Sequence, residues 1–163
     1  KKLLAVLKPR FINQALGKQA VESLWKLRRQ FSYSLRDTGY IKLNQDIVVP
    51  RGRLIELLKF TGRLQKKYKM PVACFGHAGD GNIHVNVMVE NESSEYAEFD
   101  NPVIDELFRW VVKSGGVITG EHGIGLARKP WWSLVASPEV SKLHKSVKQA
   151  LDPKGILNPG KFI

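Results

Sequence analysis

Three of the four histidines of this chain stand in glycine-rich segments, and their spacing predicts a metal site. His77 and His84 enclose the run Ala-Gly-Asp-Gly-Asn-Ile, and His122 lies in a second segment with glycines on both sides. His84 and Asn86 are two residues apart on a predicted strand, so their side chains point to the same face of a sheet. A hairpin at the glycine-rich loop would bring His77 beside His84, where two imidazoles can bind one metal ion.

A carboxylate would complete a set of three ligands, and the residues alone leave two candidates for it. Asp80 lies inside the first loop, and Glu121 stands directly before His122. Two histidines and one carboxylate suit zinc or another divalent metal and leave coordination positions open for a substrate. His122 is the candidate general base because an imidazole titrates near neutral pH. The alternative interpretation is that these are turn residues and structural histidines.

Hydrophobic spacing and turn residues predict the elements that would position this site. We expect helices over residues 19–37, 50–69, 102–113 and 137–151, and strands over residues 40–49, 72–75, 83–89 and 117–119. Helices and strands alternate irregularly, with a hairpin around the glycine-rich loop. This order favours an α+β fold, in which an antiparallel sheet is covered by helices on one face. A single domain over residues 1–163 is the simplest organisation.

Composition and charge restrict the class of partner. The net charge is +11, but the basic residues are spread over several segments without the spacing of a recognition helix or a zinc finger. We therefore expect no nucleic acid as partner, and an acidic protein surface is the better candidate. Cys74 is the single cysteine, which excludes an internal disulfide and fits a cytoplasmic location. The apolar runs are too short for a membrane span of ~20 residues. A dinucleotide or P-loop fingerprint is absent.

Three ordered motifs together resemble the C-terminal domain of FAD-linked oxidases of the vanillyl-alcohol-oxidase type. This group contains D-lactate dehydrogenases, D-2-hydroxyglutarate dehydrogenases and the flavin subunit of glycolate oxidase. The resemblance covers about residues 25–163. The motifs are Phe75-Gly-His-Ala-Gly-Asp-Gly-Asn-Ile-His-Val-Asn86, then Gly115-Gly-Val-Ile-Thr-Gly-Glu-His-Gly-Ile-Gly125, then Leu151-Asp-Pro-Lys-Gly-Ile-Leu-Asn-Pro-Gly-Lys161.

The resemblance implies roles for particular side chains. The metal ligands would be His77, His84 and Glu121, and His122 would be the general base. The remaining implied residues bind substrate or lie near the cofactor: Arg28 in the Trp-x-x-Arg sequence (with Arg29 as the alternative), Lys42, Asn86 and Ser32 for the substrate, Asn158 and Lys161 for the cofactor. Two positions depart from the D-2-hydroxyglutarate enzymes. These enzymes carry a threonine at Ser32, and their lysine stands two residues before the aspartate, whereas Lys42 stands four before Asp46.

The resemblance also implies a function for the chain. It would be the ferredoxin-like cap domain of an FAD-dependent 2-hydroxyacid dehydrogenase, which binds the substrate and a divalent metal, with zinc as the first candidate. FAD would be held mainly by an N-terminal FAD-binding domain that is absent from this chain, so we expect the isolated chain to be inactive. The alternative is a non-catalytic, metal-dependent anion-binding module or subunit derived from that domain.

Overall fold

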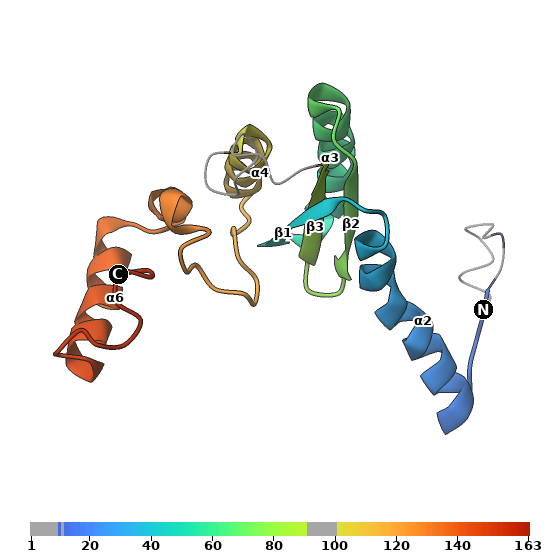
Figure 1. Cartoon of the computed structure of the whole chain (residues 1–163), viewed down its shortest axis with the longest axis horizontal. Helices are drawn as coiled ribbons and strands as arrows, with labels where there is room; N and C mark the ends of the chain where they lie inside the picture. Colours follow the sequence, from blue (N-terminus) through green and yellow to red (C-terminus); the bar gives the residue numbers. More distant parts are fainter. Residues whose placement is uncertain (1–9, 11, 91–100) are drawn as a thin grey trace. The chain divides into compact units, whose positions relative to one another are not determined.

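The computed structural model describes residues 10, 12–90 and 101–163 of the chain, and the side chains at positions 31 and 32 stay outside this description. The chain divides between Gly39 and Tyr40 into two compact units (Figure 1). A single domain over residues 1–163 therefore stays a prediction. None of the helices in the described ranges is both long enough and apolar enough to cross a membrane.

The first unit contains one described helix, α2 (Lys18–Arg36), which confirms the helix predicted over residues 19–37. Gly17 precedes it with a φ of 81°, and Arg36 in its last turn offers a favourable charge to the helix dipole. Its apolar side chains, among them Leu24 and Trp25, are exposed within this unit.

The second unit is built on a small antiparallel sheet. Its three strands are β1 (Ile41–Val48), β2 (Val72–His77) and β3 (Asn82–Val89), in the order β1-β3-β2. The hairpin between β2 and β3 is the one predicted around the glycine-rich loop. Of the strand predicted over residues 117–119, only a bridge from Val117 to Val48 forms. The β-α-β-β-α order, with this bridge beside β1, is that of a ferredoxin-like fold.

One face of the sheet forms the hydrophobic core. Because opposite residues of antiparallel strands share a face, Ile47 and Ile83 point to the same side, and Val85 and Val87 continue that row along β3. The helices α3 (Leu54–Tyr68) and α4 (Pro102–Lys113) pack on this face. Full burial of each large apolar side chain contributes roughly 1.5–3 kcal/mol. The fully buried members include Ile47, Leu57, Leu64, Val85, Val87, Ile104, Leu107 and Phe108.

Local signals explain where the other helices begin. Asn101 caps α4 by accepting a hydrogen bond from the N–H of Val103, and Ser137 caps α6 (Pro138–Leu151) through the N–H of Val140. The helix predicted over residues 50–69 starts as the 3₁₀ turn η1 (Arg51–Arg53) and continues as α3. Two short elements were not predicted, η3 (Lys129–Trp131) and α5 (Trp132–Val135).

Candidate metal centre

The second face of the sheet carries a row of polar side chains along β1 and β3. Asp46 of β1 lies opposite His84 of β3, and Asn44 lies opposite Asn86 in the same register. These side chains share the face that α3 and α4 leave open, because they alternate along each strand with the core residues. The prediction that His84 and Asn86 share one face of the sheet is therefore confirmed. On β1 this face continues from Asp46 and Asn44 to Lys42, which lies opposite Met88.

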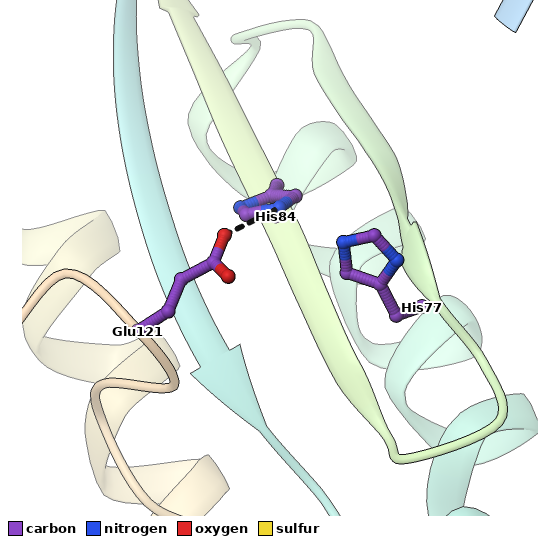
Figure 2. Close-up of side chains that lie close together, drawn as sticks. All are labelled: His77, His84 and Glu121. Atoms are coloured by element: carbon purple, nitrogen blue, oxygen red, sulfur yellow. Dashed lines mark ion pairs between the residues drawn. The ribbon is translucent and has the colours of Figure 1, made fainter.

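The β2–β3 hairpin places His77 beside His84 (Figure 2). His77 ends β2, and the centroids of the two imidazole rings are 6.0 Å apart. The turn between them needs Gly81, which has a φ of 82° and whose added Cβ would lie 2.1 Å from the carbonyl oxygen of Val49. The glycine therefore lets the hairpin pass close to the end of β1.

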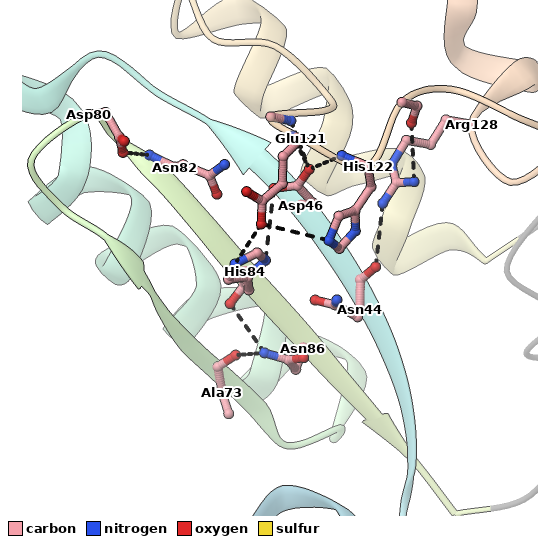
Figure 3. A network of polar contacts seen from close by, with 12 residues as sticks. Asn44, Asp46, Ala73, Asp80, Asn82, His84, Asn86, Glu121, His122 and Arg128 are labelled. Atoms are coloured by element: carbon pink, nitrogen blue, oxygen red, sulfur yellow. Dashed lines mark hydrogen bonds and ion pairs between the residues drawn. The ribbon is translucent and has the colours of Figure 1, made fainter. Parts of the chain in front are cut away.

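The loop after Val117 supplies Glu121 and His122, and the carboxylate of Asp46 holds it in place. One Asp46 oxygen, Oδ2, accepts hydrogen bonds from the backbone N–H groups of Gly120, Glu121 and His122 at 2.9, 2.6 and 2.9 Å. A Cβ at Gly120 would lie 2.2 Å from the side-chain nitrogen of Asn82, so the loop approaches the sheet closely (Figure 3). All three N–H groups thus donate to the side chain of Asp46, and that of Gly120 also reaches the backbone oxygen of Asp46.

His77, His84 and Glu121 converge in one cluster. One potential ligand atom from each residue lies within 4.8 Å of the others. The Nε2 atom of His84 is 3.8 Å from Oε1 of Glu121, and that of His122 is 3.9 Å from the same oxygen. Asp80 is not part of this cluster, and its Oδ1 accepts a hydrogen bond from the N–H of Asn82 at 3.2 Å. The geometry thus favours Glu121 over Asp80 as the third member.

The charges in the site are set by burial and by hydrogen bonds. Burial lowers the pKa of His84 below its ordinary value, although the carboxylates of Asp46 and Glu121 act in the opposite direction. A neutral imidazole with a free lone pair is the form that binds a metal ion. Burial raises the pKa of Asp46, but the three backbone N–H groups outweigh it and the pKa ends below its ordinary value. Asp46 is therefore a buried carboxylate anion at neutral pH.

His122 and Asn86 differ in their exposure to solvent. The side chain of His122 is 40% exposed, and its ring stacks on His84 with centroids 5.7 Å apart. Asn86 is fully buried, and its Nδ2 donates hydrogen bonds to the carbonyl oxygens of Ala73 and His84 at 3.1 and 3.2 Å. The imidazole of His122 is thus open to solvent, and the Nδ2 of Asn86 donates to the backbone of the hairpin.

The remaining predicted residues are not gathered around this cluster by any described contact. Arg28 lies on α2 in the first unit. Ser32 lies on the same helix, and its side chain falls outside the described residues. Asn158 and Lys161 lie in the segment after α6, where the N–H of Lys161 donates to the carbonyl oxygen of Asn158 at 3.2 Å. Lys42 alone of this set shares the polar face of the sheet.

Two charged residues that are buried beside the site were not predicted as functional. Asp46 is the first, and its signal was the alternation of Asn44 and Asp46 along β1. Arg128 is the second, with 6% exposure, and it donates long hydrogen bonds to the carbonyl oxygens of Gly123 and Asn44 at 3.4 and 3.5 Å. Nothing in the sequence indicates that Arg128 is buried, since a second basic residue, Lys129, follows it directly.

Comparison with known proteins gives a consistent set of relatives. The family model described as FAD linked oxidases, C-terminal domain, matches residues 3–162. The glycolate oxidase subunit GlcD of Bacillus subtilis (strain 168) is 31% identical over 151 residues, which cover 93% of this chain and 32% of that protein.

Two further relatives carry the names of hydroxyacid dehydrogenases. The mitochondrial D-2-hydroxyglutarate dehydrogenase of Rattus norvegicus is 35% identical over 150 residues, with 91% of this chain and 27% of that protein covered. The D-lactate dehydrogenase of Anaerostipes hadrus is 36% identical over 120 residues, with 72% and 25% covered. The chain therefore spans about a third or less of the length of these curated relatives.

Proposed function

We propose that this chain, which belongs to the family of FAD linked oxidases, C-terminal domain, forms the substrate-binding and metal-binding part of an FAD-dependent 2-hydroxyacid dehydrogenase. The substrate would be a small 2-hydroxyacid of the D-lactate, glycolate or D-2-hydroxyglutarate type, oxidised to the 2-oxoacid, because these compounds appear in the names of its relatives. The observation that carries the proposal is the convergence of His77, His84 and Glu121 on one point beside the exposed His122.

The side chains of the cluster fit a divalent metal. They offer two imidazole nitrogens and one carboxylate, a set that suits zinc and leaves positions open for two substrate oxygens. The lowered pKa of His84 favours its neutral form, which is the form that binds a metal. A divalent ion, when bound, would supply Lewis-acid polarisation that lowers the pKa of the substrate hydroxyl.

The residues around the cluster would orient the substrate and move its proton. His122 would accept the hydroxyl proton, because its imidazole is 40% exposed and lies 3.9 Å from Glu121. Lys42 on the same face of the sheet, together with Arg28 and Ser32 of α2, would bind the carboxylate and polar groups of the substrate. Asn86, on the same face of β3 as His84, would also bind the substrate, and its Nδ2 would hold the hairpin that carries both metal-binding histidines.

FAD would be bound mainly by a further domain or subunit, with Asn158 and Lys161 of this chain near it. When bound, FAD would supply the acceptor for the hydride that leaves the α-carbon of the substrate. The proton that goes to His122 and the hydride together account for the two hydrogens lost when the alcohol becomes a ketone. A substrate oriented by this chain and an electron acceptor held elsewhere would make a two-part active site.

The metal site is tested by titrating the chelator-treated chain with Zn²⁺ in a calorimeter. We expect one ion per chain, and a rise in the unfolding midpoint, because an ion that binds only the folded state stabilises it. His84→Ala and Glu121→Ala should each weaken Zn²⁺ binding at least about tenfold, through the loss of a direct ligand. His144→Ala is the matched control, since His144 is an exposed histidine of α6 that bonds its own helix at Val140.

A second titration tests the substrate class. D-lactate, glycolate and D-2-hydroxyglutarate are each added to the zinc-loaded chain and to the metal-free chain. Binding that requires zinc, and that propionate without the 2-hydroxyl group cannot reproduce, would support the proposal. Equal Zn²⁺ affinity of the wild type, His84→Ala and Glu121→Ala would overturn the assigned ligands.

A further inference from the structure

The fully buried carboxylate of Asp46 lies between the two halves of the candidate site. Its side chain is 0% exposed, and one of its oxygens accepts three backbone N–H groups, an arrangement that stabilises the carboxylate anion. A buried charge is costly unless hydrogen bonds and nearby charges compensate for it. The two oxygens of Asp46 have different surroundings (Figure 3), and each points to a different part of the site.

The first oxygen, Oδ2, fixes the backbone of the loop that carries Glu121 and His122. It receives three consecutive backbone N–H groups, those of residues 120, 121 and 122, at distances of 2.6–2.9 Å. The backbone oxygen of Asp46 also accepts from the N–H of Gly120 at 3.2 Å. Hydrogen bonds to a carboxylate are about twice as strong as neutral ones, so this oxygen sets where the third cluster residue stands.

The second oxygen, Oδ1, faces the imidazole of His84. It lies 3.8 Å from Nδ1 of His84, and both atoms are buried without a hydrogen-bond partner among the described residues. Two buried polar atoms that face each other across this distance need a shift of only about 1 Å to reach hydrogen-bond distance. Because the carboxylate can only accept, Nδ1 of His84 must then carry the proton.

We propose that Asp46 is the positioning residue of the site, which holds the Glu121–His122 loop with one oxygen and fixes His84 as its Nδ1–H tautomer with the other. In this tautomer Nε2 carries the lone pair, and Nε2 is the atom that faces Glu121 at 3.8 Å. A ligating histidine whose other nitrogen donates to a carboxylate is oriented and made more basic. Only the assignment of a metal to Nε2 rests on the proposed function, and the tautomer does not.

In an Asp46→Asn variant the proposed hydrogen bond to His84 runs in the opposite direction, because the loop permits only one orientation of the amide. The three N–H groups of the loop require an acceptor, so the amide oxygen must face the loop. The amide NH₂ group then faces His84, and Nδ1 becomes the acceptor. The proton of the imidazole moves to Nε2, where no lone pair remains for a metal. The variant therefore keeps the shape of the site while it changes one proton position.

The tautomer is measured by long-range ¹⁵N–¹H NMR on the metal-free chain with ¹⁵N-labelled histidine. At about pH 8, above the ordinary imidazole pKa of ~6.5, neutral tautomers dominate. We expect an Nδ1–H signature for His84 in the wild type and an Nε2–H signature in Asp46→Asn. Asp80→Asn is the matched control, because it removes the carboxylate of an exposed residue in the same hairpin, and it should leave the His84 signature unchanged.

Zinc affinity provides the second readout. Loss of a residue that orients a metal ligand typically weakens metal binding 10–100-fold, and we expect a loss of about this size in Asp46→Asn and none in Asp80→Asn. An Nε2–H tautomer of His84 in the wild type would overturn the proposal, and this measurement requires no variant to fold. A wild-type chain with the Nδ1–H tautomer that binds no zinc would instead refute the proposed function and leave the role of Asp46 standing.

Discussion

At the scale of single residues, the site depends on a glycine as much as on its polar side chains. Gly120 lies where the loop touches the sheet, and a Cβ there would be 2.2 Å from Nδ2 of Asn82 and 2.9 Å from Oδ1 of Asp46. The backbone N–H of Gly120 is also one of the three that bind Asp46. The loop can therefore contact the strands this closely only because residue 120 has no side chain.

Gly120→Ala should displace the loop and destabilise the chain. Overpacking of this kind costs about 1–3 kcal/mol, and a displaced loop would also separate Glu121 from His84. Urea unfolding measures the first effect, and a zinc titration measures the second. Gly79→Ala is the control in the neighbouring loop, because an added Cβ there meets nothing within 4 Å. Equal stabilities of the two variants would contradict the close approach at Gly120.

At the scale of elements, α4 is tied to the segment after the site by a carboxylate. Asp105 of α4 binds Arg109 in the same helix and accepts a hydrogen bond from the indole N–H of Trp131 at 3.0 Å. The hydrogen bond from Arg109 and that from Trp131 lower the pKa of Asp105 below the ordinary value of 3.8, although burial acts against them. The ionised form of Asp105 therefore stabilises the folded state.

This contact predicts a pH dependence of stability. A carboxylate whose pKa is lower in the folded state stabilises the fold above its unfolded pKa, and the effect is lost as the pH falls through the folded pKa. We expect Asp105→Asn to reduce the free energy of unfolding by less than about 1 kcal/mol near neutral pH, because the side chain is 40% exposed. The difference from wild type, measured by urea unfolding, should shrink towards about pH 3. A difference that grows on acidification would contradict this assignment.

The elements themselves were largely predictable, whereas their contacts were not. Glycines around the two histidines and alternating residues in 83–89 were sufficient for the hairpin. Amphipathic spacing was sufficient for α3 and α4, and the capping Ser137 followed by proline was sufficient for α6. The sequence could not show that Glu121, and not Asp80, joins the two histidines, because Glu121 lies on a loop that is far from β1 in the sequence but contacts it in the fold. Of the strand predicted over 117–119 only a bridge to β1 forms, and the loop that follows it is held by hydrogen bonds to the carboxylate of Asp46. Such long-range hydrogen bonds leave no periodic pattern.

At the scale of the whole molecule, the proposed function requires a further domain or subunit that holds FAD. The net charge is +11, and α6 exposes a row of apolar residues with Leu143, Val147 and Leu151 on one side. Exposed apolar residues at helical spacing, with lysines beside them, are suited to an interface with an acidic rim.

The isolated chain should therefore bind substrate without oxidising it. We expect the purified chain to carry no flavin absorbance and to show no dye-linked oxidation of D-lactate, glycolate or D-2-hydroxyglutarate, even when it is loaded with zinc. The reason is that a hydride leaving the substrate has no acceptor in a site made of His77, His84, Glu121 and His122. Absorbance spectra and a dye-reduction assay, with free FAD added in a parallel sample, provide the measurement. Turnover by the chain alone would contradict the division into two parts, whereas zinc-dependent substrate binding without turnover is the result that this division predicts.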